Sequence, residues 1–474
     1  MDTIAAVATG SAASAIGIVR VSGEGCSAAC GRVFRPANGR PFGEQPPRKL
    51  VMGEMLDSRG RVIDRGLAVR FPAPHSYTGE DSAELHCHGS PVVLRELLSA
   101  LFAAGAAGGT PVRQAEAGEF TKRAFLNGRM DLTQAEAVVD LIDAETAAAA
   151  RNAAAQLHGG LRRRLEPIQN ALLETASRFY AVVDYPDEDI EDVNPEQISA
   201  ALREAEEKLT ALLDTCRRGR VLKRGVRTAI VGLPNAGKSS LLNALAGYDR
   251  AIVTDVPGTT RDTVEESVLC GGVLLRLVDT AGLRETEDAV ERLGVERSRR
   301  AMEEAELILL VRDGSVEACP ENRARQEAEA RLLNEVAGTG KPWLCLESKC
   351  DLTGPHAFSV GLIQKDANNP AACLCVSSVT GEGLDKLEAA VAALFPAGDG
   401  GEAGSLLTDR RQEDAARRAR DAVRRGREAL EAGFTPDAVL TDAEEALDAL
   451  GELTGRTAKE EIVSAIFSRF CVGK

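Results

Sequence analysis

Residues 232–239 read Gly-Leu-Pro-Asn-Ala-Gly-Lys-Ser and match the phosphate-binding pattern G-x-x-x-x-G-K-[ST]. The apolar segment 228–231 before this loop is predicted to be a buried parallel strand, and residues 240–245 after it a helix. In that order, the loop N–H groups and the helix N-terminus form a cradle for a polyphosphate. The motif therefore predicts an α/β nucleotide-binding domain. We expect the loop contacts to come from Asn235, Ala236, Gly237, Lys238, Ser239 and Ser240, with Lys238 on the outer phosphates and Ser239 on Mg²⁺.

Four further motifs follow in the order that such a site requires. Asp279-Thr280-Ala281-Gly282 comes after the apolar segment 273–278, where Asp279 can hold the Mg²⁺ shell and Gly282 can offer its N–H to a terminal phosphate. Thr260, within residues 254–262, is placed to complete that shell. Asp351, in Ser348-Lys349-Cys350-Asp351, would accept two hydrogen bonds from guanine and reject adenine. Ser377 would close the base pocket. The contacts predicted from residues 254–260 are Thr254, Asp255, Val256, Pro257, Gly258, Thr259 and Thr260.

This set of motifs resembles the TRAFAC class of GTPases, with two departures. In that class the guanine motif reads Asn-Lys-x-Asp, whereas this chain has Ser348 in the first position. A serine cannot supply the same amide contacts, but Asp351 is retained. The sequence therefore predicts that guanine preference is preserved and that affinity is weaker.

The second departure is Leu283, which stands where Ras-like proteins carry the glutamine that orients the attacking water. The negative charge that develops in the transition state must be stabilised from elsewhere. Asn235, Thr254, Val256 and Thr259 offer amide, hydroxyl or backbone oxygens around the phosphate loop. Such a cluster suits a monovalent cation in the place of an arginine finger.

Composition limits the other possibilities. A chain of 474 residues suggests two to four domains, and its net charge of −15 argues against a nonspecific nucleic-acid coat. The N-terminus lacks the charged and apolar regions of a signal peptide, and no run of 18 apolar residues predicts a membrane span. The eleven cysteines are scattered, which favours reduced thiols and a cytoplasmic protein.

The chain is predicted to contain three structural parts. Short β-rich runs and one helix make residues 1–119 an α+β domain. Residues 120–216 and 397–474 are helical, and strands alternate with helices in 217–396. Thr133-x-x-Glu136 is interpreted as a capping box, as are Thr441-x-x-Glu444 and Thr457-x-x-Glu460. We expect the two helical stretches to pack as one all-α domain, into which the α/β nucleotide domain is inserted.

The whole chain resembles the MnmE (TrmE) family of tRNA-modification GTPases. Motifs shared with that family run from residue 2 to the last lysine, and the Cys-x-Gly-Lys ending is highly specific to it. The shared motifs are Asp2–Ile4, Gly17–Gly23, Ser76–Asp81, Glu84–Gly89, Gly118–Asn127, Asp131–Ala137, Asp187–Glu191, Gly258–Asp262 and Ile466–Lys474.

The resemblance implies residue roles that the pattern alone does not give. The N-terminal domain would be similar to tetrahydrofolate-binding domains, would mediate dimerisation, and would bind a folate such as 5-formyltetrahydrofolate. The implied folate-site residues are Arg20, Glu84, Arg129 (where lysine is expected) and the terminal Lys474. The family's potassium site corresponds to Asn235, Thr254, Val256 and Thr259, and its catalytic acid to Glu291, which would orient the attacking water when two nucleotide domains meet.

The implied reaction adds a carboxymethylaminomethyl or aminomethyl group at carbon 5 of the tRNA wobble uridine. A flavin-dependent partner, MnmG (GidA), would act with a homodimer of this chain in a heterotetramer, and GTP hydrolysis would drive a domain rearrangement. One rival is a regulatory RNA- or ribosome-associated GTPase; a second is a folate-dependent transferase with a vestigial nucleotide domain. The complete phosphate loop, Thr260 and Asp279 speak against the second.

Three other features have two interpretations each. His86-Cys87-His88 contains potential metal ligands, but alternation along a strand would turn Cys87 away from both histidines. Cys471 could be a nucleophile or a structural thiol. The eight arginines of residues 410–427 could contact tRNA phosphates or form ion pairs along a solvated helix.

Overall fold

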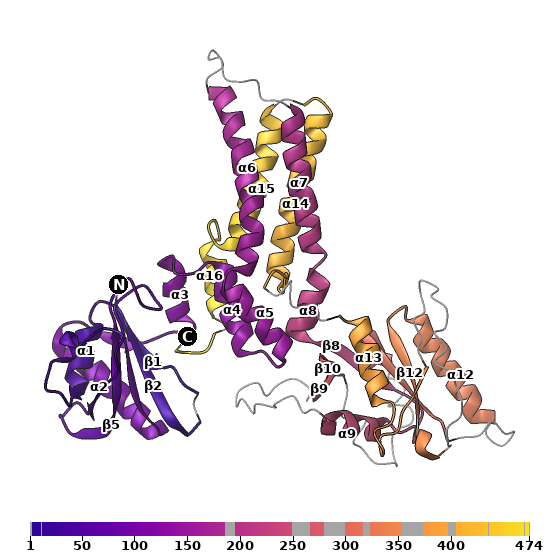
Figure 1. Cartoon of the computed structure of the whole chain (residues 1–474), viewed down its shortest axis with the longest axis horizontal. Helices are drawn as coiled ribbons and strands as arrows, with labels where there is room; N and C mark the ends of the chain where they lie inside the picture. The colour runs from indigo at the N-terminus through magenta and orange to yellow at the C-terminus, as the bar shows by residue number, and fades with distance from the viewer. Residues whose placement is uncertain are drawn as a thin grey trace. The chain divides into compact units, whose positions relative to one another are not determined.

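The computed structural model describes residues 2–10, 12–184, 195–248, 266–278, 299–315, 323–352, 373–396, 404–434, 436–468 and 470–473 (Figure 1). The chain forms two compact units, each assembled from separate stretches of sequence. The first contains Met1–Val139, Leu157–Arg203 and Arg418–Lys474, and the second contains Asp140–Gln156 and Glu204–Arg417.

The first unit begins with a seven-stranded sheet of order β3-β4-β5-β6-β2-β1-β7. Its strands are β1 (Thr3–Val7), β2 (Ser14–Ser22), β3 (Phe34–Pro36), β4 (Val51–Leu56), β5 (Val62–Phe71), β6 (Ser82–Gly89) and β7 (Val112–Gln114). Alternation along β2 and β6 packs Val19 and Leu85 against helices α1 (Cys26–Val33) and α2 (Pro91–Gly108). The same alternation turns His86 and two of the predicted folate residues, Arg20 and Glu84, to the opposite face.

The helices of the first unit come from both ends of the chain. Helix α6 packs along α15, and α16 packs against α3 (Figure 1). The predicted packing of the two helical stretches is therefore confirmed. The helices that lie wholly in the first unit after the sheet are α3 (Glu119–Leu126), α6 (Gly160–Asp184), α15 (Pro436–Thr454) and α16 (Glu460–Phe467). Helices α4 (Leu132–Ile142), α7 (Pro195–Leu213) and α14 (Arg410–Glu431) are divided between the two units, and α8 (Cys216–Arg224) and nearly all of α5 (Ala147–Leu157) belong to the second.

The second unit contains a six-stranded sheet of order β13-β12-β11-β8-β10-β9. All neighbouring strands run parallel except β10 and β9. The strands are β8 (Val226–Val231), β9 (Glu266–Cys270), β10 (Val273–Leu277), β11 (Leu307–Asp313), β12 (Trp343–Ser348) and β13 (Cys373–Cys375).

Helices cover both faces of this parallel sheet, which confirms the predicted α/β class. Leu309 packs with α9 (Lys238–Tyr248) and α13 (Leu384–Leu394), while its neighbours Ile308 and Leu310 pack with α12 (Arg323–Gly338). Because β11 is covered on both sides, Leu307–Val311 is a continuous apolar and buried run.

Several predicted helix ends are wrong. The capping box of α4 is formed by Asp131 and Gln134, not by Thr133 and Glu136. The Asp131 carboxylate accepts from the Gln134 N–H (2.9 Å), and the Gln134 amide oxygen accepts from the Asp131 N–H (2.9 Å). An aspartate–glutamine pair satisfies the same two N–H groups as the Ser/Thr–Glu pattern that guided the prediction.

The two C-terminal capping boxes are also wrong. Thr441 lies inside α15, and α16 begins at Glu460, after Lys459 in the N-cap position. The hydroxyl of Thr457 instead donates to the Asp448 carbonyl (3.0 Å). Helix α7 ends at Leu213, and the basic helix α8 that follows it crosses the boundary at 216/217 predicted between the helical stretch and the nucleotide domain.

Helix α2 is the one described helix that is long and apolar enough to cross a membrane, with a mean hydropathy of 1.3 over 18 residues. Its apolar face packs inside the protein, since Leu94, Leu97 and Leu101 are buried in the core of the first unit. Arg95 and Glu96 interrupt the apolar run.

Candidate functional site

The predicted phosphate loop joins the end of β8 to the start of α9, so the strand–loop–helix order is observed. Asn235 and Gly237 both have left-handed backbones, with φ of 60° and 92°. Gly237 must be small as well, because a Cβ there would lie 3.1 Å from the Ser348 hydroxyl oxygen. The loop curls between β8 and the N-terminal N–H groups of α9, which is an arrangement suited to an anion.

Lys238 lies in the curl of this loop. Its Nζ donates to the carbonyl oxygens of Gly232 (2.8 Å) and Leu233 (2.9 Å). Burial lowers the pKa of Lys238, because the ammonium group loses hydration. A bound anion would counter that cost, so the position is suited to a polyphosphate.

Much of the predicted metal and catalytic set falls outside the described residues. Strand β10 runs parallel to β8, and the Val278 N–H donates to the Thr228 carbonyl (3.0 Å). Val278 is the last residue of the described stretch 266–278, so Asp279 lies just outside it. The predicted residues outside the described part are Thr254, Asp255, Val256, Pro257, Gly258, Thr259, Thr260, Asp279, Thr280, Ala281, Gly282, Glu291 and Lys474. Ser239 and Asn235 are described, and both side chains are exposed.

Ser348 connects the end of β12 directly to the phosphate loop. It is 2% exposed, and its hydroxyl donates to the Ala236 carbonyl (2.6 Å), with the Arg312 carbonyl 3.0 Å away. The residue after it, Lys349, has a left-handed backbone (φ 59°) and donates to the Asn235 carbonyl (3.0 Å). The absence of an amide at position 348 is therefore partly offset on the loop side by a hydroxyl contact.

Asp351, the predicted guanine-binding carboxylate, is oriented by Ser377. The Ser377 hydroxyl donates to Asp351 Oδ1 (2.7 Å) and accepts from the N–H groups of Val379 (3.3 Å) and Thr380 (3.1 Å). The structure thus brings Ser348, Lys349, Asp351 and Ser377 together beside the phosphate loop, although they are distant from it in sequence.

Asp313, at the end of β11, was not identified from the sequence. Its carboxylate accepts from Lys349 Nζ (2.7 Å) and from the Ser315 hydroxyl (2.6 Å). Burial raises the pKa of Asp313, but these hydrogen bonds outweigh burial and hold the pKa below its ordinary value. The available signal was a carboxylate at the carboxyl end of a central strand, next to the strand that carries the phosphate loop.

Two of the predicted folate residues form one cluster on the sheet of the first unit. Arg20 Nε donates to Glu84 Oε1 (3.0 Å), and its guanidinium lies 5.5 Å from the ring centroid of Tyr77. His86 Nε2 lies 3.2 Å from Glu84 Oε2. The contact with His86, and then the charge of Arg20, lower the pKa of Glu84 against the opposing effect of burial. Glu84 is thus held as an oriented carboxylate.

Arg129 and the C-terminal tail approach this domain from the helical side. Arg129 is exposed, and its stem lies beside Gly79 in the loop that carries Tyr77. Val472 forms an antiparallel bridge with Ala117, and the Gly118 N–H donates to the Cys471 carbonyl (3.3 Å). The tail therefore runs along the first unit, with the side chain of Cys471 exposed.

The structure favours a strand over a metal site at His86-Cys87-His88, and helix ion pairs over an RNA contact at residues 410–427. Cys87 is buried, His86 contacts Glu84 and His88 Nδ1 contacts Asp64 (2.9 Å). Among the residues that the structure describes, no group of three or more His, Cys, Asp or Glu is arranged for a metal ion. Ion pairs also occupy the arginine-rich helix α14, including Arg417–Glu413, Arg418–Glu452, Arg424–Asp421, Arg425–Asp442 and Arg427–Glu431.

Comparison with known proteins extends the similarity over the whole chain. The model of the family described as GTP-binding protein TrmE N-terminus matches residues 3–129, and that of the MnmE helical domain matches residues 132–471. The tRNA modification GTPase MnmE of Symbiobacterium thermophilum is 44% identical over 473 residues, covering 100% of this chain and 99% of the relative. The MnmE proteins of Heliobacterium modesticaldum and Akkermansia muciniphila are each 42% identical with the same coverage.

Proposed function

The chain belongs to the MnmE family of tRNA modification GTPases, and on that premise we propose that it modifies carbon 5 of the wobble uridine in a potassium-stimulated, folate-dependent reaction. The observation that carries this proposal is the full-length similarity, 44% identity over 473 residues, which includes both the nucleotide domain and the N-terminal domain. GTP hydrolysis in tRNA modification is the function of the family. The finer chemistry, the partner and the residue roles are our proposal.

In the proposed nucleotide site, the N–H groups of residues 235–240 and the ammonium group of Lys238 bind the phosphates. Mg²⁺ would be held by Ser239, Thr260 and Asp279, and it would neutralise charge on the transferred phosphoryl group. Ser239 lies in the first turn of α9, directly after Lys238, and this position fits that role. Glu291 orients the attacking water in this proposal.

We propose a potassium site formed by Asn235, Thr254, Val256 and Thr259. Asn235, the one described member of this set, fits a cation ligand because its side-chain amide is exposed in the loop. Its backbone is left-handed, and its carbonyl accepts from Lys349 Nζ. A cation there would supply the positive charge that stabilises the transition state in place of an arginine finger.

For the base, we propose that Asp351 reads the guanine edge. The two oxygens of the carboxylate can accept from the adjacent N1–H and N2–H groups of guanine, and adenine lacks that pair of donors. Ser377 holds Asp351 in place (2.7 Å), and Ser348 together with Lys349 ties the base loop to the phosphate loop.

In the N-terminal part, we propose a folate site built from Arg20, Glu84, Arg129 and Lys474, for 5-formyltetrahydrofolate or a related folate. The Arg20–Glu84 pair beside Tyr77 supports it, because a pterin needs polar partners at its edge and an aromatic or cationic surface at its face. We further propose a cytoplasmic homodimer that acts with MnmG on tRNA, with Cys471 near the chemistry. Domain boundaries at 119/120, 216/217 and 396/397 complete the proposal.

The alternative is a regulatory RNA- or ribosome-associated GTPase without a role in base modification. The full-length match speaks against it, since the N-terminal part and the helical part each match family models of their own. Mass spectrometry of tRNA from a deletion strain separates the two. We expect the modified wobble nucleoside to disappear, and to return with the wild-type gene but not with Lys238→Ala. Unchanged wobble nucleosides in the deletion strain would exclude the proposal.

A further inference from the structure

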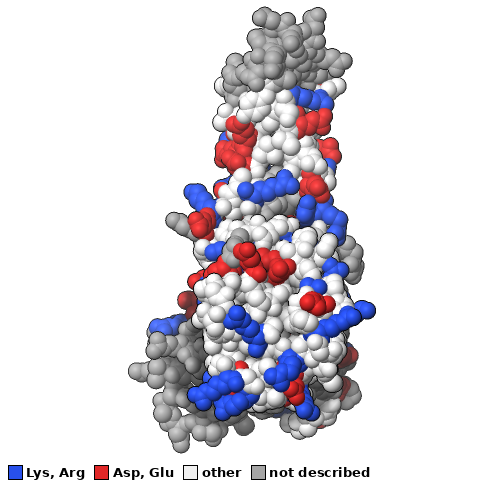
Figure 2. Space-filling model, turned by 90° about the vertical axis from the view of Figure 1, so that its left-hand side faces the viewer, with Lys and Arg blue, Asp and Glu red and all other residues white. Residues whose placement is uncertain are grey.

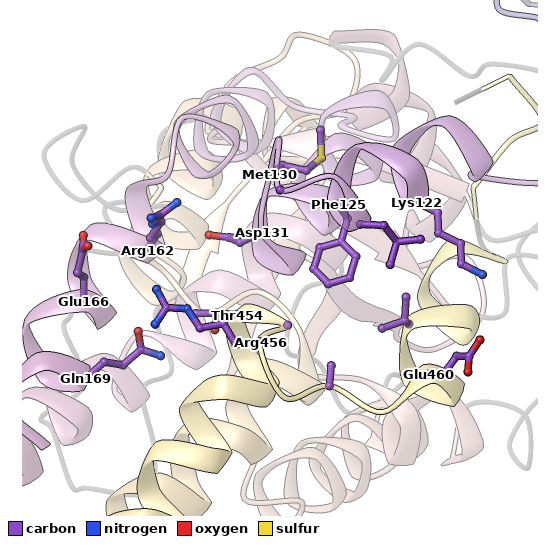
Figure 3. A pocket seen from close by; sticks show the side chains of 15 residues that line it. Lys122, Phe125, Met130, Asp131, Arg162, Glu166, Gln169, Thr454, Arg456 and Glu460 are labelled. Carbon is purple, nitrogen blue, oxygen red and sulfur yellow. The ribbon is translucent and has the colours of Figure 1, made fainter. Parts of the chain in front are cut away.

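A pocket of about 550 Å³ lies within the first unit, and none of its lining residues belongs to the phosphate loop or to the Arg20–Glu84 pair. Helices α3 and α6, the loop between α3 and α4, and the stretch from the end of α15 to the start of α16 line it (Figure 3). One part of its wall is apolar, with Phe125, Met130 and Val463. The other part is polar and carries Arg162, Glu166, Gln169 and Arg456 (Figure 3).

Three cations line this pocket without an anionic partner among the residues described: Lys122, Arg162 and Arg456. This contrasts with α14, where Arg417, Arg418 and Arg425 are each ion-paired. Arg162 also lies in the first turn of α6, where the partial positive charge of the helix N-terminus disfavours a cation. Unpaired cations in an unfavourable position are what an anion-binding wall requires.

An independent observation comes from Asp131, which also lines the pocket. Its Oδ1 accepts from the Thr133 hydroxyl (2.6 Å) and the Gln134 N–H (2.9 Å), and so caps α4. Its Oδ2 is buried and has no hydrogen-bond partner among the described residues. A buried carboxylate oxygen without a donor is costly, and this oxygen marks the wall at Asp131 as polar and unsatisfied.

The pocket therefore combines arginines, an apolar wall with an aromatic ring, and the exposed carboxylates of Glu166 and Glu460. Because it carries both charges, a purely anionic ligand does not match it. A nucleotide has each matching part: a phosphate for the arginines, a flat base for the apolar wall, and base N–H groups for an exposed carboxylate. Phe125 is half-buried, since its ring packs near that of Phe467 (6.2 Å between centroids), and the part of Phe125 that lines the pocket is the surface on which a base would stack.

We propose that this pocket binds a single unpaired nucleotide of the tRNA, with its phosphate on Arg162 and Arg456 and its base against Phe125. The inference rests on the proposed function, which supplies the RNA. One bound nucleotide fits a chain of net charge −15 better than a broad basic surface does. On the face shown in Figure 2, the described basic and acidic residues are interspersed.

The test uses the full-length protein and an unmodified tRNA transcript, with affinity measured by fluorescence anisotropy at several salt concentrations. The double variant Arg162→Ala/Arg456→Ala is expected to bind at least about tenfold more weakly, because it cannot form the charge-assisted hydrogen bonds to phosphate. The slope of its salt dependence should fall by about one unit for each phosphate that the variant no longer neutralises. Affinity for a fluorescent GTP analogue should stay unchanged.

The matched control is Arg163→Ala. Arg163 is the next residue of the same helix turn, is exposed, and donates to the His158 carbonyl (2.7 Å), and neither residue lines the pocket. We expect this variant to bind tRNA within about twofold of wild type. Thermal unfolding of all variants establishes that they are folded.

Equal weakening by Arg163→Ala, or wild-type affinity of the double variant, would overturn the proposal. If RNA affinity is unchanged but binding of a flavin-dependent partner protein falls, the pocket serves a protein and the proposal is again wrong. Failure of the proposed function is a separate result, because it shows as absent GTP hydrolysis or unchanged wobble nucleosides whatever the pocket variants do.

Discussion

Replacing Ser348 by alanine tests how the base loop and the phosphate loop depend on each other. The Ser348 hydroxyl donates to the Ala236 carbonyl over 2.6 Å, across 112 residues of sequence, and both residues are almost fully buried. Alanine keeps the backbone and removes the hydroxyl, which contacts the Ala236 carbonyl and, at 3.0 Å, the Arg312 carbonyl of β11. The effect on GTP binding reports on the shorter contact, because that one joins the two loops.

The size of the effect follows from the burial of the contact. A typical hydrogen bond contributes about 1 kcal/mol, and leaving a buried acceptor without its donor costs about 1–3 kcal/mol. Ala236 is 1% exposed, so water cannot readily replace the missing hydroxyl. If the contact holds the loop in its binding geometry, GTP has to restore that geometry on binding. We predict about tenfold weaker GTP binding, which corresponds to about 1.4 kcal/mol.

The assay is titration of wild type and Ser348→Ala with a fluorescent GTP analogue, followed by competition with GTP and with ATP. We expect the variant to keep its preference for GTP, because Asp351 and its partner Ser377 are untouched. Urea unfolding measures the part of the effect that appears as reduced stability. Ser348→Asn is measured alongside, and guanine preference should be retained there as well.

The control is Ser27→Ala, which makes the same chemical change at a half-buried position of α1. It should leave both GTP affinity and stability unchanged. The reasoning is refuted if Ser348→Ala binds GTP within twofold of wild type and unfolds within about 0.5 kcal/mol of it. A preference of the wild type for ATP would refute the role given to Asp351.

Three further predictions concern other parts of the chain. Lys223 Nζ bridges Asp140 (2.8 Å) and Asp409 (3.2 Å), so Lys223→Met leaves two half-buried carboxylates facing each other and should cost about 2–3 kcal/mol in urea unfolding; a cost below about 0.5 kcal/mol would contradict this. Burial opposes both charges, but the ion pairs with Asp140 and Asp409 raise the pKa of Lys223. The Arg411 N–H and Lys223 together lower the pKa of Asp409. This stabilisation is therefore present between about pH 4 and pH 10, and it is lost as pH falls through the folded pKa of Asp409 or rises through that of Lys223. Arg20→Lys removes the fork that holds Glu84, and calorimetry should show about tenfold weaker binding of 5-formyltetrahydrofolate with unchanged GTP affinity; equal folate affinity would argue against the site. GTP hydrolysis should be at least roughly tenfold faster in K⁺ than in Na⁺, and equal rates would eliminate the cation site.

The fold could be predicted from sequence wherever one local pattern determined the outcome. The apolar segment 228–231 was predicted to be a strand and lies in β8, because the phosphate loop after it required a strand before it and a helix after it. Helix ends were less predictable, because several residue pairs satisfy the same N–H groups. At α4, Asp131 and Gln134 form the cap two residues before the Thr133–Glu136 pair that fits the usual pattern.

Part of the predicted site is brought together in the structure, but the residues that support it were not predicted. Lys238, Ser348, Asp351 and Ser377 carry recognisable motifs, whereas Asp313 carries none. Its role depends on Lys349 turning through a left-handed backbone to reach it (2.7 Å), and no pattern of spacing encodes that turn. The pocket with Arg162 and Arg456 was missed for the same reason, since its walls come from stretches about 300 residues apart.

The order of strands explains why residues so distant in sequence meet beside the phosphate loop. Strands β13, β12, β11 and β8 are consecutive neighbours and run parallel, so their carboxyl ends lie along one edge of the sheet. Ser377 follows β13, Lys349 follows β12, Asp313 ends β11, and the phosphate loop follows β8. Each hydrogen bond in the chain from Asn235 through Lys349 to Asp313 joins residues at this same edge. A side chain at the opposite end of any of these strands could not join that chain, whatever its chemistry, because the sheet itself would lie between them.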